Sequence, residues 1–223
     1  MRPQSRLARF LLVVGACAVL AAATDPPALS QRHNTVSFEE GEEGWYPLFD
    51  GKGLDGWVVP EGADWQVRDG EIVVETGANN LLIYDETFSD FELKVDFLAA
   101  PSANSGVFVR VTGKALVPGT KAYEVNIAPP GNPFPTGSVI HVEAGAEGRP
   151  PKFGTSKKAE GVGESEEWRT YDITAIGGRF TIKIDGQVVA ELDDPEPIAE
   201  GYIGLQHNTG KVQFRNVKVR RLK

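Results

Sequence analysis

Two short segments in the middle of the chain carry polar residues in a pattern that could do chemistry. In YEVNI the apolar and polar residues alternate, so an extended chain places Glu124 and Asn126 on one face. In VFVR the same alternation predicts that Phe108 and Arg110 share a face. If the segments are neighbouring antiparallel strands, a carboxylate, an amide, a guanidinium and a ring line one sheet face. Such a face suits a carbohydrate, and solvated surface residues would give the same pattern.

Glu124 is the first candidate for an acid–base group, and His207 near the end of another predicted strand is the second. His207 could equally cap a turn. Asn104 and Gln206 would add amide groups that bind sugar hydroxyls. Ordinary glycosidases place two carboxylates about 5–9.5 Å apart around the bond that they cleave. The unplaced candidates for a second carboxylate are Glu75, Asp85 and Glu143.

The first 23 residues differ from the rest of the chain. Arg2, Arg6 and Arg9 precede a short apolar run and three alanines, which predicts a secretory signal over residues 1–23. The protein is therefore expected to be exported, to the periplasm or the cell exterior. A lipoprotein anchored through Cys17 is the alternative, because the residues before this cysteine loosely resemble a lipobox.

Charge narrows the class of partner. Residues 1–23 hold three of the 23 basic residues and none of the 31 acidic ones, so the rest of the chain carries a formal charge of −11. This argues against nucleic acid and anionic membranes and favours a neutral ligand such as a glycoside. The apolar run is too short for a membrane span. Removal of the signal takes away the one cysteine, so no disulfide or thiol nucleophile is expected. The oligomeric state is not indicated.

The remaining sequence reads as a linker followed by one β domain. Residues 24–43 are rich in proline and acidic residues and predict a flexible acidic linker. Residues 44–223 consist of short alternating runs separated by glycine, asparagine and aspartate, including two Asp-Gly hairpin signals. This favours an all-β fold, a two-sheet antiparallel jelly-roll sandwich. Phe214 and Val217 are three apart, which predicts a bulge between them if both are buried.

One long segment interrupts the strands. Residues 128–167 are rich in proline and glycine, and only residues 138–143 look like a strand. A loop of this length inside a compact domain is commonly functional or disordered. Because it follows Glu124 and Asn126 directly, we expect it to form a rim or lid over their sheet face. A surface excursion without a role is the alternative.

Several motifs, in order along the chain, resemble one family. These are LFDGKGLDGW near residue 48, WQVRDGEIV, NSGVFVR, YEVNI, and IGLQH followed by FRNV near the end. Together they resemble the 3-keto-disaccharide hydrolase family, formerly a domain of unknown function, over residues 44–223. The sequence departs from the family's pattern at Asn126, where glutamine is usual, and at Ile140, where tyrosine is usual. Asn208 begins a stretch that is commonly shorter.

The resemblance implies a concanavalin A-like fold and cleavage of glycosides whose sugar is oxidised at carbon 3. In such a sugar the carbonyl acidifies the proton on carbon 2, so one base suffices to start elimination of the group on carbon 1. Glu124 or His207 would be that base, and Arg110 or Asn104 would stabilise the enolate. No cofactor is expected. A divalent ion held by Glu124, His207 and a loop carboxylate stays open, although no metal-binding motif is present. The alternative function is a carbohydrate-binding module or lectin-like domain without catalysis. Catalysis is expected to bring Glu124, His207 and Arg110 into one cleft under the 128–167 loop, whereas binding alone predicts an open face with exposed aromatic rings.

Overall fold

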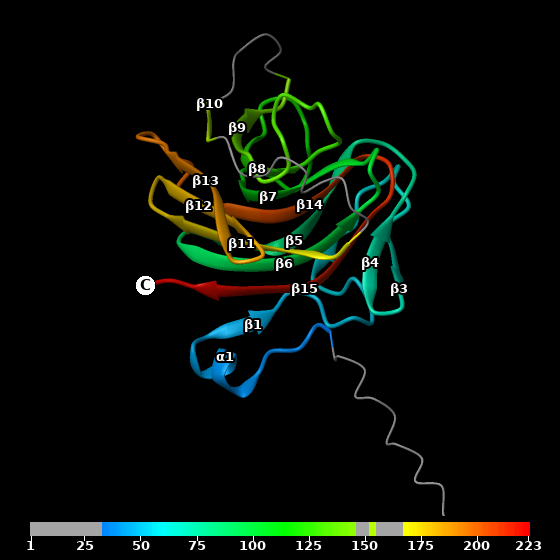
Figure 1. The fold of residues 1–223 in the computed structure, drawn as a ribbon, viewed down its shortest axis with the longest axis horizontal. Coiled ribbons are helices and arrows are strands. Elements are labelled where there is room, and N and C mark those ends of the chain that lie inside the picture. Colours follow the sequence, from blue (N-terminus) through cyan, green and yellow to red (C-terminus); the bar gives the residue numbers. More distant parts are fainter. Residues whose placement is uncertain (1–32, 146–151, 155–166) are drawn as a thin grey trace, which may run out of the picture. The chain divides into compact units, whose positions relative to one another are not determined.

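A computed structural model of the chain describes residues 33–145, 152–154 and 167–223. The predicted signal over residues 1–23, with Cys17, lies outside the described residues. The described residues, from residue 33 onwards, belong to one compact unit, in which the strands form two antiparallel sheets and are accompanied by one short helix. Figure 1 shows the two layers of strands. The structure confirms the predicted two-sheet antiparallel sandwich.

The two sheets are named by their place relative to the candidate residues. The front sheet contains, in spatial order, β10 (Lys152–Gly154), β9 (Val139–Glu143), β8 (Lys121–Ile127), β7 (Asn104–Val111), β14 (Gly201–Thr209), β5 (Asn80–Phe88) and β2 (Trp57–Val58). The back sheet contains β13 (Gln187–Asp193), β12 (Arg179–Ile184), β11 (Arg169–Ile176), β6 (Phe91–Ala99), β15 (Val212–Arg221), β4 (Glu71–Val74) and β3 (Gln66–Arg68), and β1 (Trp45–Pro47) also pairs with β15. The chain enters β14 from β13 and leaves it to β15, both in the back sheet, so that β14, which is late in the sequence, lies between β7 and β5.

The alternation in the sequence becomes the division between core and surface. In β6 the residues Phe91, Leu93, Val95 and Phe97 are buried, and the residues between them are only partly covered. Their inward side chains join one core cluster with those of the front sheet, including Val107, Val125 and Leu205. Burial of this apolar surface is the main force that holds the two sheets together.

Both predicted Asp-Gly hairpins are present. Asp69 and Gly70 have φ angles of 52° and 80° between β3 and β4, and Asp185 and Gly186 have 50° and 78° between β12 and β13. Two successive positive φ angles are what a two-residue turn of the primed type requires. This turn geometry matches the twist of the strands and sets the pairing next to each turn, and in the second hairpin the register shifts again between Ile182 and Lys183.

The predicted bulge in β15 is also present. Phe214 and Val217 are both fully buried. The pairing with β6 shifts between Arg215 and Lys218, and Asn216 has φ of 50°. The extra residue turns the strand so that both apolar side chains face the core.

The predicted linker does not extend to residue 43. Residues 38–42 form the helix α1 (Phe38–Glu42), which begins with a capping box between Ser37 and Glu40. Glu40 also pairs with Lys218 of β15, and Asn34 exchanges hydrogen bonds with Asn216 at the β15 bulge. Residues 33–43 therefore pack on the sandwich, because their polar side chains find partners in its last strand, and only residues 24–32 remain as predicted linker outside the described part.

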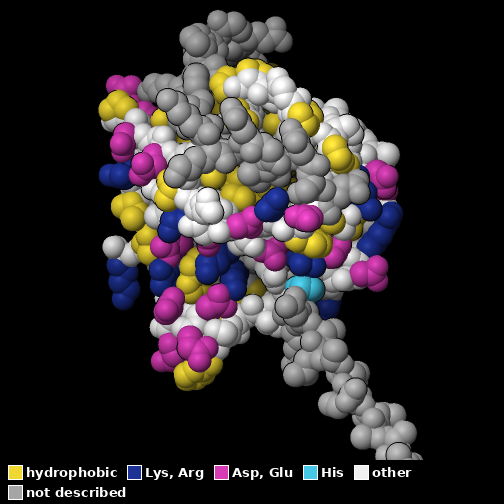
Figure 2. Space-filling view, viewed as in Figure 1, with side chains coloured by type: hydrophobic (Ala, Val, Ile, Leu, Met, Phe, Trp, Pro, Cys, Tyr) yellow, Lys and Arg dark blue, Asp and Glu magenta, His cyan; other side chains and the backbone are white. Residues whose placement is uncertain are grey.

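The described surface carries charges of both signs. Figure 2 shows basic and acidic side chains interspersed over one face of the protein. Within residues 33–145 and 167–223, no helix is long and apolar enough to cross a membrane.

Candidate functional site

A cavity of about 560 Å³ lies over the outer face of the front sheet, the face turned away from the back sheet. Strands β7, β8, β9 and β14 contribute to its floor, and the connections on either side of β8 form its walls. This volume lies within the range of pockets that hold small molecules. The cavity is therefore the candidate site among the described residues.

Strand register brings four of the predicted residues into this cavity. Glu124 lies opposite Phe108 on β7, and Asn126 lies opposite Gly106, which in turn lies opposite Gln206 on β14. Directly paired residues in antiparallel strands point to the same face. Phe108, Glu124, Asn126 and Gln206 accordingly all line the cavity.

Glu124 lies at the centre of the floor. A side chain at Gly106 would meet the Cγ and Oε1 atoms of Glu124 at 3.1 Å, so the absence of one leaves room for the carboxyl group to lie across the neighbouring strand. Protein atoms surround the carboxyl group except on the cavity side, and this burial raises its pKa to about 7. No residue in the described part of the chain gives Glu124 a hydrogen bond or an ion pair.

Amides surround one side of this carboxyl group. Asn126 donates a hydrogen bond from its side chain to the carbonyl of Phe134, which ties the loop after β8 to the cavity. Gln206 donates from Nε2 to the side chain of Asn79 at 3.2 Å, and its Oε1 has no donor among the described residues. Asn104 also lines the cavity, as predicted, at the start of β7. These amides can bind the hydroxyl groups of a neutral ligand.

The prediction that Arg110 shares the face of Phe108 is wrong. Arg110 has φ of 51°, and along β14 the partner of Phe108 is Gly204 while the partner of Val111 is Tyr202. Three steps on β7 thus match two on β14, which is a bulge. The extra residue turns Arg110 to the inner face, where its side chain is fully buried.

The guanidinium of Arg110 is fully engaged there. It donates to the carbonyl groups of Ser89, Gly177 and Ile198 and to the carboxylate of Asp90, at 2.5–3.1 Å. Burial lowers its pKa, and the nearby Asp90 opposes that shift. Arg110 is therefore a structural crosslink and not an enolate donor.

The predicted pairing of His207 with Glu124 is also wrong. His207 lies opposite Ser105, which lies opposite Ile127, so it points to the inner face, whereas Glu124 points outward. Its ring is buried, with Nδ1 3.3 Å from the carbonyl oxygen of Ala78. An ion shared by Glu124 and His207 is excluded by this geometry. The described part of the chain holds no cluster of three or more His, Cys, Asp or Glu side chains suited to a metal.

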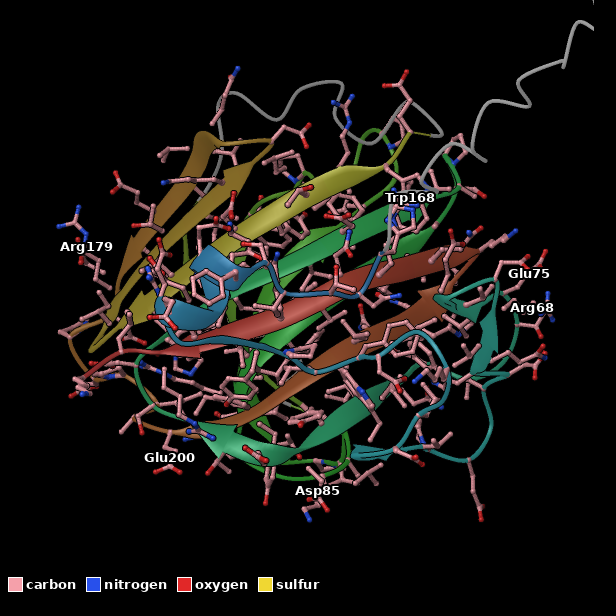
Figure 3. All side chains as sticks on the ribbon, turned by 90° about the horizontal axis from the view of Figure 1, so that it is seen from below. Arg68, Glu75, Asp85, Trp168, Arg179 and Glu200 are labelled. Atoms are coloured by element: carbon pink, nitrogen blue, oxygen red, sulfur yellow. The ribbon has the colours of Figure 1, made fainter. Side chains whose placement is uncertain are left out.

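The three carboxylates considered as a second catalytic acid lie in different places. Glu143, at the end of β9, lines the cavity rim. Asp85 pairs with Lys114, and Figure 3 shows both Asp85 and Glu75 at the periphery of the sandwich. Neither Asp85 nor Glu75 lines the cavity.

A second histidine on the inner face contacts a carboxylate. His141 Nδ1 lies 2.9 Å from Asp194, whose side chain is fully buried and also accepts a hydrogen bond from Tyr123. Burial is the main cause that raises the pKa of Tyr123, followed by this hydrogen bond. Since His141 lies opposite Tyr123 and not opposite Glu124, this cluster is separated from the cavity by the sheet.

Most of the cavity wall was not predicted from the sequence. Leu116, Val117 and Pro118 come from the connection between β7 and β8, and Asn132 and Phe134 from the connection after β8. The described part of the 128–167 segment thus lines the cavity, as expected of a rim, while residues 146–151 and 155–166 lie outside the described residues. Position next to Glu124 in the sequence was the only signal for these loop residues.

Comparison with known proteins gives a family and a fold. The profile of the family described as 3-keto-alpha-glucoside-1,2-lyase-like domain matches residues 44–220. No curated protein matches the sequence significantly. Among solved structures, one candidate glycosyl hydrolase from Parabacteroides distasonis is 26% identical and covers 80% of this chain and 99% of its own, with a TM-score of 0.58.

Two further structures share the fold at lower identity. A second candidate glycosyl hydrolase from Parabacteroides distasonis is 19% identical, covers 86% of this chain and all of its own, and has a TM-score of 0.60. A carbohydrate binding module from Bacillus subtilis is 16% identical, covers 74% of this chain and 95% of its own, and has a TM-score of 0.56. The family profile spans most of the sequence and the whole sandwich except its N-terminal helix. The chain therefore belongs to the family of 3-keto-alpha-glucoside-1,2-lyase-like domains.

Proposed function

We propose that the protein cleaves glycosides whose sugar is oxidised at carbon 3, with Glu124 as the general base. The observation that carries this proposal is the Glu124 carboxyl group, which lies centrally in the cavity, has no partner among the described residues and has a pKa of about 7. A carboxyl group with this pKa holds and releases a proton near neutral pH, which is what general acid–base catalysis requires. Membership of the family supports the same reaction class.

The reaction balances with one carboxylate. Glu124 removes the proton from carbon 2, the electron pair moves towards carbon 3, and the carbonyl oxygen becomes an enolate. Expulsion of the group on carbon 1 restores the carbonyl and leaves a double bond between carbons 1 and 2, while the leaving oxygen takes the proton that Glu124 removed, which restores the carboxylate. Water then adds across this double bond, so the overall reaction consumes one water. Asn104, with its amide at the cavity, is our candidate donor to the enolate oxygen.

The spacing of carboxylates argues against an ordinary two-carboxylate glycosidase. The backbone of Glu143 lies three residues beyond Ile140, the partner of Glu124, which is about 10 Å along an extended strand, so the two side chains start from well-separated backbone positions. The described cavity lining holds no other carboxylate. Retaining and inverting glycosidases need separations of about 5–5.5 Å and 6.5–9.5 Å. A single-base elimination therefore fits the cavity better than a carboxylate pair.

Carbohydrate binding without catalysis is the second candidate. Its support is that neither Arg110 nor His207 joins Glu124, so the cavity lacks the three-residue constellation expected for catalysis. The likeness to a carbohydrate binding module shows that this fold is also used for binding. Against it, the floor ring of Phe108 is buried, so the partly buried ring of Phe134 in the wall is the one ring in the described lining on which a sugar could stack.

Incubation with methyl 3-keto-glucoside, as both anomers, tests the proposal. We expect the wild type to release 3-keto-glucose and Glu124→Gln to turn over about 10²–10⁴ times more slowly. Glu143→Gln should stay near wild type if one carboxyl group suffices, and an equal loss in both variants would favour a carboxylate pair. Wild-type binding without product release would establish the second candidate, and equal turnover by Glu124→Gln would remove Glu124 from the chemistry.

A further inference from the structure

The cavity changes character along the direction of the strands. Asn126 and Gln206 lie in the row of paired residues on one side of Glu124. On the other side, the next row contains Ala122 and its partner Val142. Rows of residues on one sheet face are about 7 Å apart. Glu124 thus separates an amide end of the cavity from an apolar end.

The amide end continues beyond the floor. Asn79, Asn104, Asn132 and Asn208 line the cavity besides the two floor amides. These side chains offer donors and acceptors without net charge, which suits the hydroxyl and carbonyl groups of a sugar. If the proposed reaction holds, the oxidised ring occupies this end, with its reacting carbons at Glu124.

The apolar end rises from the floor to the rim. Leu116 and Val142 pack on a small apolar cluster of the outer face that includes Phe108 and Ala122. Above them Val117, at 53% exposed, is the one large apolar side chain with high exposure among the described residues that lines the cavity. Pro118 lies beside it.

A second sugar would fit this end poorly. A hydroxyl group that is buried against apolar side chains without a hydrogen bond loses about 1–3 kcal/mol. Glu143, exposed at the rim, is the one charged side chain in the described lining of this end. An apolar group would instead cover surface that water now contacts.

We propose that the apolar end binds an apolar leaving group, so that the preferred substrates are 3-keto-glycosides of alkyl or aryl alcohols rather than 3-keto-disaccharides. This inference rests on the proposed function of the same cavity. It places the bond to be cleaved at Glu124, the sugar among the amides and the leaving group against Leu116, Val117 and Val142.

Cyclohexyl and methyl 3-keto-glucosides test the preference, because their leaving alcohols have similar acidity and differ mainly in apolar area. We expect kcat/KM to be about tenfold higher for the cyclohexyl compound, from partial burial of its ring. Isothermal titration with the unoxidised cyclohexyl and methyl glucosides should show the same order in affinity without any reaction. A 3-keto-disaccharide should fall at or below the methyl compound.

Two matched surface variants test whether the preference for the cyclohexyl compound arises at the apolar end of the cavity. Val117→Ser should reduce the cyclohexyl preference from about tenfold to about threefold, because it removes apolar contact at the rim. Ile176→Ser is the control, since Ile176 is exposed to 51% but lies outside the cavity. Equal values for both compounds, or an equal response to both serine variants, would overturn the inference.

The two proposals fail in different ways. Cleavage of both 3-keto-glucosides at equal rates would contradict the proposal of an apolar leaving-group site and would still support the proposed enzymatic activity. Tighter binding of cyclohexyl glucoside than of methyl glucoside, without cleavage of any 3-keto-glucoside, would contradict the proposed enzymatic activity and support the proposal that the apolar end binds apolar groups.

Discussion

Arg110 and Glu124 are ionisable side chains on adjacent strands of one sheet, and they differ in the face on which they lie and in their hydrogen-bond partners. Arg110 is fully buried on the inner face, and four groups accept hydrogen bonds from its guanidinium. Glu124 is partly buried on the outer face and has no partner among the described residues. Removal of one member of a buried, paired charge leaves its partners unpaired and lowers stability, whereas a buried carboxyl group without a partner is a candidate for a functional role. The contrast separates a structural residue from a catalytic candidate.

Loss of the Arg110 guanidinium should have the largest effect on stability. Arg110→Met should lower the free energy of unfolding by about 3–5 kcal/mol, because it removes the donors to three carbonyl groups and the cation that pairs with Asp90. Urea denaturation measures this difference.

An exposed arginine gives the matched control. Arg179 pairs with Glu191 on the surface, and Figure 3 shows it pointing outward, so Arg179→Met should change stability by about 0.5 kcal/mol or less. If Arg110→Met kept wild-type stability and lost turnover, the assignment of Arg110 as structural would be wrong.

Removal of the Glu124 charge should have the next largest effect on the free energy of unfolding, and it should raise this free energy rather than lower it. The pKa is about 7 in the folded protein and about 4.5 as an ordinary carboxyl group. Between these values the unfolded chain is ionised while the folded one keeps its proton, so wild-type stability falls as pH rises through this window. Glu124→Gln should therefore be more stable than wild type by about 3 kcal/mol at pH 8 and about equal to it at pH 4.

Thermal unfolding of both proteins across this pH range checks the difference. A gap between the wild type and Glu124→Gln that does not change between pH 4 and pH 8 would show that the carboxyl group titrates normally.

His207 should give the smallest effect of the three. His207→Gln should lower stability by about 1 kcal/mol, because the contact with the Ala78 carbonyl is lost, and should leave turnover within about twofold. Turnover of 3-keto-glucoside and urea denaturation, measured on the same preparations, separate the two effects. A loss above tenfold in a stably folded variant would return His207 to the chemistry.

The two bulges show how far the sequence could predict this site. In β15 the three-residue spacing of Phe214 and Val217 conflicts with a regular strand, so the bulge was visible in the sequence and is present. In β7 the bulge at Arg110 leaves no such conflict, because a polar residue flanked by valines fits regular alternation equally well. The sequence therefore placed Arg110 on the wrong face.

The other features of the site likewise divide into those that a local sequence pattern predicts and those that depend on tertiary structure. The alternation of polar and apolar residues predicted that Glu124 and Asn126 share one sheet face. Together with the hairpin signals it also predicted the two-sheet sandwich, because both features follow from local sequence patterns. Alternation within a single strand did not show that His207 faces the opposite side from Glu124, because that depends on pairing between strands far apart in sequence. The loop side chains at the rim, such as Val117, follow from tertiary packing and carry no periodic signal.

The pH dependence of kcat/KM for methyl 3-keto-glucoside tests the role of Glu124 most directly, because this profile reports the pKa of the free enzyme's essential base. A Glu124 base predicts that kcat/KM rises with pH to a plateau, with a midpoint near the pKa of about 7, and that Glu124→Gln removes the rise together with most of the activity. A midpoint near 4.5, the ordinary value for a glutamate, or an unchanged profile in Glu124→Gln would contradict it.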